Sequence, residues 1–199
     1  MADWGELERR AQARYEAAEQ PLRRATAAGA AGLAAMMRGS DGGTWLALSA
    51  EEYRASWRDG SWGRPIGAIK ARILAGDWDA AAADARWALQ LGAAGSESPI
   101  GRYAAALAAA VLGEWDEVRV HADRARTDET FPTEVADALA FIAAEDVVGY
   151  VEAVEDVLES FESRDAYLED VPVADTVLVL QALAERRGMA AELESHLLP

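Results

Sequence analysis

A short pattern of residue types occurs twice in this chain. Residues 74–81 read LAGDWDAA, and residues 111–118, thirty-seven positions later, read VLGEWDEV. Alanine-rich runs flank both copies, and the two regions align without gaps. A repeat of this length, with a glycine between two runs that favour helix, restricts the chain to architectures in which one helical unit stacks on the next.

Each copy has the residues that a tight turn between two antiparallel helices requires. The glycine can adopt the positive φ that ends a helix, a conformation that a side chain opposes. The acid that follows lies at the start of the next helix, where a carboxylate meets free N–H groups and the positive end of the helix dipole. The tryptophan is then placed to fold back onto the preceding helix. Six residues are therefore predicted to be structural turn residues: Gly76, Asp77, Trp78, Gly113, Glu114 and Trp115.

Helical periodicity runs through the rest of the chain, and strand signals are scarce. We expect an all-α fold, a right-handed array of antiparallel helical hairpins of the tetratricopeptide-like type, because the repeat length is near the period of about 34 residues of that class. The repeats are degenerate, and a looser third copy is expected at 143–158, with Tyr150 in a packing role. Such arrays present a concave surface to partners.

The expected elements divide the chain into two regions of one structural domain. Residues 1–64 form an N-terminal cap of helices with a tryptophan-containing loop, and residues 65–199 form the hairpin repeats. Residues 40–45 are expected to be a loop, followed by a helix that a capping box of Ser49 and Glu52 opens. The expected helices are one capped by Asp3, one that Pro21 starts or kinks, and those at 49–57, 65–75, 78–91, 99–112, 115–126, 132–145, 147–163, 172–187 and 190–197.

Composition removes several kinds of chemistry. Cysteine is absent and only two histidines occur, so disulfides, thiol catalysis and Cys- or His-based metal centres are excluded. No EF-hand spacing, P-loop, dinucleotide-binding glycine pattern or nucleophile elbow is present. His121, with Asp116 and Asp123 close in sequence, is the kind of lone helical histidine that is usually structural. We therefore expect no enzymatic activity, no catalytic residue, no metal and no cofactor.

The chain is strongly acidic, with a formal net charge of −16 and Lys70 as its only lysine. Phosphate binding requires cation clusters that are missing here, so neither nucleic acid nor a membrane is an expected partner. The N-terminus lacks the apolar segment of a secretory signal, and the apolar run at 103–113 is too short to span a bilayer. A cytoplasmic protein is expected, whose acidity serves solubility, adaptation to high salt, or a basic protein partner.

The helix at 147–163 separates into two faces. Val147, Val151, Val154, Leu158 and Phe161 are expected to form its buried stripe. Acidic residues lie elsewhere on its surface with no cation among them, although like charges at this spacing cost a few tenths of a kcal/mol per pair. They form either a solvated face or a docking surface for a basic protein. These candidate partner-binding residues are Glu152, Glu155, Asp156, Glu159 and Glu162.

A second candidate surface is the loop WRDGSW at 57–62. Trp57 and Trp62 lie in it, and Trp45 is nearby in sequence. Aromatic residues in loops are frequent anchors of protein interfaces. They also serve as pins that hold one segment on another, so both interpretations stay open for Trp57 and Trp62.

The C-terminal part of the chain resembles a known family. The helix ALAERRGM at 182–189, the ending ELESHLLP at 192–199, the loop entered through Val171–Pro172 and the upstream GDWDAAA hairpin are similar to an all-helical immunity-protein family of bacterial polymorphic toxin systems, the one numbered 49. The resemblance covers residues 65–199. It implies a protein that neutralises a cognate toxin by binding it, and it transfers no individual functional residue.

The expected function is therefore a non-enzymatic, protein-binding helical-repeat module, and the resemblance implies an immunity protein with a cognate toxin as partner. The acidity of the chain agrees with a basic partner. The alternative is a structural or regulatory helical protein that acts through self-association, which makes a homo-oligomer an open expectation.

Overall fold

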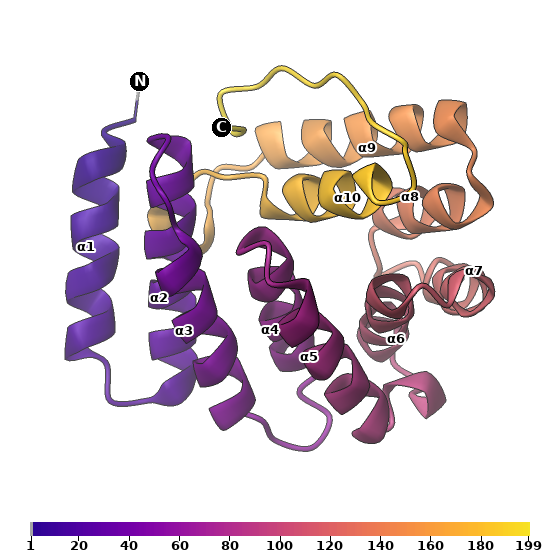
Figure 1. Cartoon of the computed structure of the whole chain (residues 1–199), viewed down its shortest axis with the longest axis horizontal. Helices are drawn as coiled ribbons and strands as arrows, with labels where there is room; N and C mark the ends of the chain where they lie inside the picture. The colour runs from indigo at the N-terminus through magenta and orange to yellow at the C-terminus, as the bar shows by residue number, and fades with distance from the viewer. Residues whose placement is uncertain (1) are drawn as a thin grey trace.

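The computed structural model describes residues 2–199, and helices follow one another along this range (Figure 1). No strand occurs within residues 2–199, and neighbouring helices pack against one another in series, so the predicted all-α array of helical hairpins is confirmed. The α-helices are α1 (Trp4–Ala17), α2 (Pro21–Met37), α3 (Gly43–Ala55), α4 (Gly63–Leu74), α5 (Trp78–Gln90), α6 (Pro99–Leu112), α7 (Trp115–Ala125), α8 (Thr133–Ala144), α9 (Val147–Glu162) and α10 (Asp175–Glu185). Two short 3-10 turns are η1 (Ala93–Gly95) and η2 (Leu168–Asp170).

The repeated motif forms the turns between α4 and α5 and between α6 and α7. Gly76 and Gly113 both have positive φ, 69° and 78°. After Gly76, the backbone N–H of Asp77 donates to the carbonyl of Arg72 at 3.1 Å, which satisfies a free carbonyl at the end of α4. The Asp77 carboxylate accepts from the backbone N–H three residues later at 3.0 Å, whereas Glu114 makes no such side-chain cap. The shorter acid therefore caps its helix, and the longer one contributes only its charge.

The third copy of the repeat forms the same turn between α8 and α9. Glu145 occupies the left-handed position, with φ 57°, that glycine holds in the other two turns. The backbone N–H of Asp146 donates to the carbonyl of Phe141 at 3.0 Å, and the Asp146 carboxylate accepts from the N–H of Gly149 at 3.0 Å. Tyr150, one turn further on, is completely buried. The turn between α8 and α9 thus keeps the hydrogen-bond pattern of the other two turns although it contains no glycine.

The three hairpins form a curved array with α4, α6 and α8 as its inner helices (Figure 1). Helix α5 bridges α4 and α6, and α7 bridges α6 and α8. Six buried alanines on α6 let its neighbours approach closely. At the other end α1, α2 and α3 continue the series, since Leu46 and Ala50 of α3 pack against Ala68 and Ala71 of α4.

The predicted loop at 40–45 and the capping box at Ser49 are wrong. Helix α3 begins inside that stretch, and Ser49 lies in its middle, where its buried hydroxyl donates to the carbonyl of Ala25 at 2.8 Å. The glycines that suggested a loop are required by packing instead. A Cβ on Gly42 would collide with the carbonyl oxygen of Gly32 on α2, so this glycine allows α2 and α3 to approach.

The predicted helix at 190–197 is also wrong, because this segment forms a non-helical tail. The side-chain amide of Gln181 on α10 donates to the carbonyl of Ala191 at 2.7 Å. The carbonyl of Leu197 accepts from the backbone N–H of Ala174 at 3.0 Å, and the Leu197 side chain is completely buried. Hydrogen bonds to α10 and its entry therefore replace those that a helix would make within itself.

Helix α10 lies inside the curve of the hairpins (Figure 1). It packs against α4, α8 and α9 and buries Val177, Leu180 and Leu183. Helix α10 therefore occupies part of the concave surface that such arrays present to partners. Apolar inner faces of helices are costly to leave in water, and the chain covers them with its own last helix.

Two consecutive arginines at the end of α10 hold the repeat motifs together. The guanidinium carbon of Arg186 lies 4.3 Å from the ring centroid of Trp78, and that of Arg187 lies 4.3 Å from the centroid of Trp115. Arg186 also donates to a carbonyl at the end of α6 at 3.2 Å, and Arg187 pairs with the carboxylate of Glu145. One short segment thus contacts all three hairpin turns.

We predict that Arg186→Ala and Arg187→Ala each lower the free energy of unfolding by about 1–2 kcal/mol, because each loses a cation–π contact and a hydrogen bond. Chemical denaturation followed by circular dichroism measures the change. Arg119→Ala on the exposed side of α7 is the matched control and should be neutral. Equal stability of all three variants and the wild type would contradict this role of the arginines.

Candidate functional site

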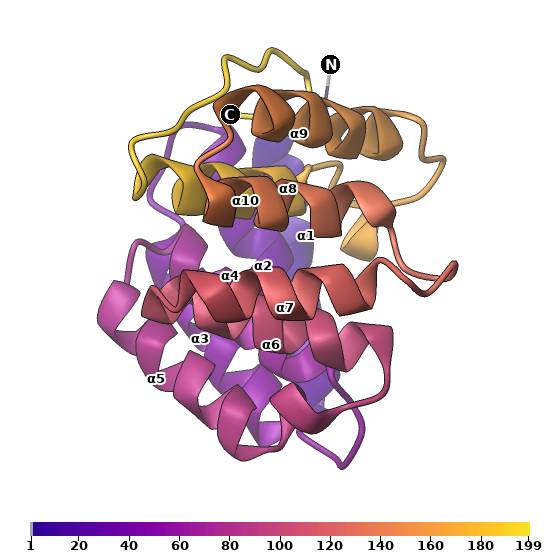
Figure 2. The same cartoon turned by 90° about the vertical axis from the view of Figure 1, so that its right-hand side faces the viewer.

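The five carboxylates that the sequence singled out on α9 are all exposed. We call them the acidic face; they are Glu152, Glu155, Asp156, Glu159 and Glu162. Their spacing places them on the side of the helix away from its buried residues. Figure 2 shows α9 at the edge of the array, with only the C-terminal tail beyond it. Within residues 2–199 none of the five forms an ion pair, and Glu162 accepts a hydrogen bond from the Ser195 hydroxyl at 2.6 Å.

The buried stripe of α9 differs from the predicted one. Val154, Leu158 and Phe161 are buried as predicted, but Val147 is 47% exposed and Val151 is half-buried. The residues buried in their place are Tyr150, Ala153 and Val157. The reason is that α9 is covered from two directions, by α8 and by α10, so its buried side is wider than one stripe. The tyrosine donates its hydroxyl to a side-chain amide oxygen of α10.

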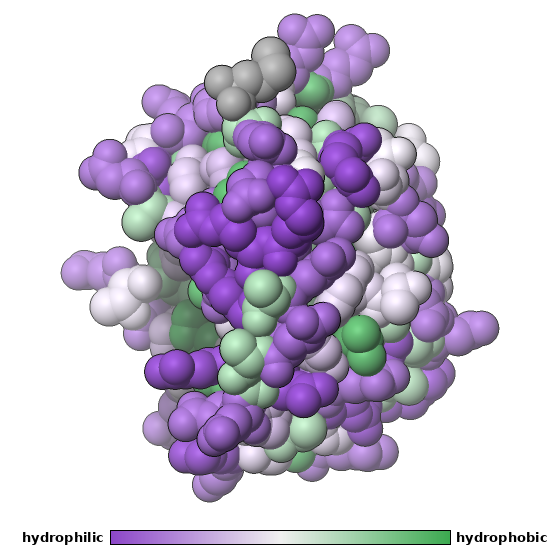
Figure 3. Space-filling model, turned by 90° about the vertical axis from the view of Figure 1, so that its left-hand side faces the viewer, coloured by the Kyte–Doolittle hydropathy of each residue, from purple (hydrophilic) through white to green (hydrophobic). Residues whose placement is uncertain are grey.

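The side of the molecule that α1 forms is strongly hydrophilic too (Figure 3), but many of its charges are paired. Arg14 lies 3.1 Å from Glu169 and 2.7 Å from Asp170 of η2, and Arg9 lies 2.7 Å from Glu6. Exposed pairs of this kind contribute little stability, and they leave little net charge to attract a partner. The acidic face differs in having no cation of its own.

Trp57 and Trp62 lie between α3 and α4, and both are half-buried. The ring centroid of Trp57 is 5.4 Å from that of Trp62 and 6.0 Å from that of Trp87 on α5, and Trp62 also packs on the main core. This arrangement is expected of aromatic residues that pack the N-terminal helices against the hairpin array. A role in partner binding stays a prediction for both residues.

A pocket that the sequence did not indicate opens where the inner helices begin. Its cavity is about 220 Å³, and we call it the concave pocket. Its walls come from the N-terminal parts of α4, α6 and α8, from α9, and from Thr176 at the start of α10. The principal lining residues are Ile66, Ile100, Tyr103, Phe131, Val135 and Phe161. In sequence each looks like an ordinary core residue near a helix end, so no local signal could have grouped them.

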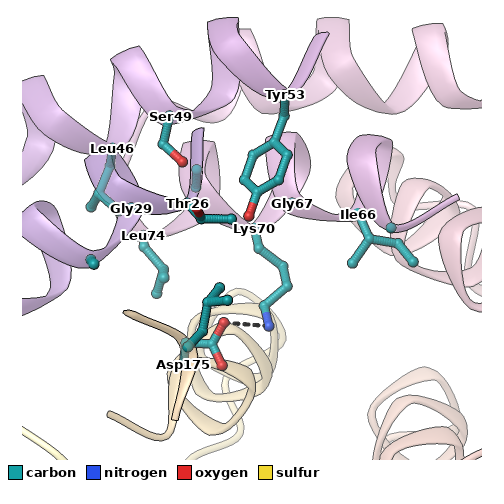
Figure 4. A pocket seen from close by; sticks show the side chains of 14 residues that line it. Thr26, Gly29, Leu46, Ser49, Tyr53, Ile66, Gly67, Lys70, Leu74 and Asp175 are labelled. Carbon is teal, nitrogen blue, oxygen red and sulfur yellow. Dashed lines mark ion pairs between the residues drawn. The ribbon is translucent and has the colours of Figure 1, made fainter. Parts of the chain in front are cut away.

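A second cavity of about 220 Å³ lies between α2, α3 and α4 and contains Lys70 (Figure 4). Lys70 Nζ is 2.6 Å from Asp175 Oδ2 and donates to Thr176 Oγ1 at 2.9 Å, so its charge is used to attach α4 to the start of α10. Tyr53 lines the same cavity, and burial, with smaller contributions from Asp175 and Glu169, raises its pKa to about 12. The tyrosine is thus a neutral donor at neutral pH.

Asp84 on α5 is a buried carboxylate that the sequence did not single out. Arg54 of α3 pairs with it, and Arg72 Nε of α4 lies 3.5 Å from its other oxygen. The Arg54 guanidinium also lies over Trp87, 4.6 Å from the ring centroid. One buried charge therefore links three helices. Removing either cation would leave a buried charge with less compensation, so this cluster is structural.

His121 is buried on α7. Its Nε2 lies 3.7 Å from a Glu117 carboxylate oxygen, and its Nδ1 has no hydrogen-bond partner within residues 2–199. Asp116 and Asp123 are not within ion-pair distance of it in the described part of the chain. The pKa of His121 is lowered, mainly because burial disfavours the charged ring; Glu117 opposes this effect and two nearby arginines add to it.

The lowered pKa predicts a pH dependence of stability. His121 is harder to protonate in the folded chain than in the unfolded chain, where its pKa is about 6.5. The free energy of unfolding that the neutral ring contributes is therefore complete above about pH 6.5 and is lost as the pH falls below that value. We predict that the wild type loses more free energy of unfolding than His121→Gln between about pH 7.5 and about pH 5.5. Urea denaturation at the two pH values measures both losses, and equal losses would contradict the prediction.

No helix within residues 2–199 is long and apolar enough to cross a membrane. The same residues hold no group of three or more His, Asp or Glu side chains arranged to bind a metal ion. No protein-family model matches the chain, and no curated protein or solved structure matches it either.

Proposed function

We propose that this protein is a non-enzymatic, protein-binding helical-repeat module whose acidic face docks a basic partner. The observation that carries the proposal is the gathering of five exposed carboxylates on α9 with no cation paired to them within residues 2–199. Like charges on one helix repel one another at a cost of a few tenths of a kcal/mol per pair. A cationic partner relieves that repulsion and is steered toward the face by its field.

The position of α9 supports the same surface. Helix α10 packs against α4 and α8 on the inner side of the array, and several charges on the α1 side are already paired with one another. The acidic face belongs to a helix that is fixed by packing against both α8 and α10, so its carboxylates are held on a rigid element. A rigid charged face lowers the ordering cost of binding.

The more specific form of the proposal is an immunity protein that neutralises a cognate toxin in the cytoplasm. The resemblance of residues 65–199 to an immunity-protein family supports this form, as does the acidity, because toxins that act on nucleic acid are often basic. Neutralisation by binding requires no catalytic residue in this chain. Genes beside this one that encode a large secreted toxin would support the proposal, and their consistent absence across relatives would contradict the immunity form.

The charge of the acidic face is tested with a labelled basic peptide, Lys-Arg-Trp-Arg-Lys, whose binding is measured by fluorescence polarisation. We predict that a triple variant, Glu152→Gln, Glu155→Gln and Glu159→Gln, weakens binding roughly tenfold, because exposed ion pairs contribute about 0.2–1 kcal/mol each. The difference should shrink at high ionic strength. Glu162 is left unchanged because it accepts the Ser195 hydrogen bond.

The matched control removes the same charge elsewhere through Glu16→Gln, Glu19→Gln and Asp59→Asn, at three exposed positions outside α9. This variant should bind the peptide nearly as the wild type does. If both triple variants weaken binding equally, only the overall charge matters and the acidic face is not a docking surface.

The alternative function, self-association of a structural or regulatory protein, is favoured by one observation. Val147 and Val148 at the start of α9 are 47% and 70% exposed, which is unusual for adjacent aliphatic residues. In this case we expect light scattering to give a dimer mass that Val148→Asp reduces to the monomer. A monomer at the highest soluble concentration would contradict the alternative.

A further inference from the structure

The concave pocket lies where three inner helices present apolar side chains from their first turns. Ile66 comes from α4, Ile100 and Tyr103 from α6, and Val135 from α8. Ile100 is 40% exposed at the opening, and the centroids of the Tyr103 and Phe131 rings are 5.4 Å apart. The cavity volume of about 220 Å³ exceeds the roughly 150 Å³ of an apolar cavity known to hold benzene, so the space suits a bicyclic aromatic ring.

Arg164 gives the opening of this pocket a flat surface. Its guanidinium carbon lies 3.6 Å from the ring centroid of Phe161, and the side chain forms no ion pair within residues 2–199. A guanidinium is planar and can stack on aromatic rings. Because Arg164 also lines the pocket, its guanidinium offers a planar group on which an entering ring can stack.

Tyr103 adds a polar group to these apolar walls. The residue is only 9% exposed, and its hydroxyl is reached by solvent but forms no hydrogen bond to a protein group within residues 2–199. Burial, followed by the charge of Asp175, raises the pKa of Tyr103, so the hydroxyl stays neutral. An unpartnered phenol accepts a hydrogen bond from an N–H donor, and among aromatic side chains tryptophan carries such a donor.

One carboxylate lines the pocket, and the acidic face of α9 adjoins it. Glu134 of α8 lines the pocket, and Asp156 of the acidic face lies one helical turn before Ser160, which also lines it. Helix α9 thus carries pocket walls and acidic residues on adjoining sides. Cations that flank an aromatic residue in a partner would reach these carboxylates while the ring occupies the pocket.

We infer that the concave pocket binds an aromatic side chain, tryptophan in preference, from a basic segment of the protein partner. This inference rests on the proposed function, because it places an anchor residue of the partner beside the acidic face. Anchors of this kind, buried in a pocket and surrounded by polar contacts, carry most of the affinity of protein interfaces. The acidic face attracts the basic segment, and the pocket selects its sequence.

The test compares two labelled peptides, Lys-Arg-Trp-Arg-Lys and Lys-Arg-Ala-Arg-Lys, by fluorescence polarisation. The wild type should bind the tryptophan peptide roughly tenfold more tightly. Ile100→Ala and Arg164→Lys should reduce that ratio toward one and leave the affinity for the alanine peptide nearly unchanged. The lysine variant keeps the positive charge and removes only the planar stacking surface.

Val120→Ala on α7 is the matched control, since Val120 is 42% exposed, close to the 40% of Ile100, and lies outside the pocket. It should keep the full preference for the tryptophan peptide. Thermal melts check that the variants stay folded, which is expected for Ile100 and Arg164 because both are exposed.

The outcomes separate this inference from the proposed function. A ratio near one in the wild type, or a ratio that Ile100→Ala and Arg164→Lys leave intact, overturns the pocket as an aromatic site. If the alanine peptide still binds and the acidic-face variant weakens it, the proposed function stands without the pocket. If neither peptide binds, both are overturned.

Discussion

Arg186 and Arg187, at the end of α10, stack on the two tryptophans of the repeated motif, and Arg187 also pairs with the third turn. These contacts fix the last helix inside the curve of the array, where it covers apolar surfaces of α4, α8 and α9. Successive hairpins of a repeat protein normally contact only their neighbours. Here one segment contacts all three turns, so the array has contacts beyond those between neighbouring hairpins.

The position of α10 limits which inner surfaces stay accessible. With α10 packed against α4, α8 and α9, a pocket remains at the N-terminal parts of α4, α6 and α8. Beside it, α9 faces outward with unpaired carboxylates, while on the α1 side several arginines are matched to acids. Binding would therefore use one continuous region, in which an apolar opening adjoins an acidic helix face.

Patterns of neighbouring residues predicted the hairpin turns correctly, but they did not distinguish glycines that allow close helix packing from glycines in loops. The turn at Gly76 depends on residues adjacent in sequence, which supply the positive φ and the carboxylate cap. Gly42 has the same appearance in sequence, yet its role is to let α3 approach Gly32 of α2. The tail is a similar case, since the residues that satisfy its backbone, such as Gln181, belong to another element.

The amino-acid sequence by itself determined the all-α class, the turn positions and the charged side of α9, because each depends on residues within one or two helical turns of one another. Only the tertiary structure decided that α10 occupies the concave side, that Ala153 and Val157 join the buried side of α9, and that Ile100, Phe131 and Phe161 line one cavity. Those features depend on which helices meet in three dimensions, and such contacts leave no periodic signal in the chain.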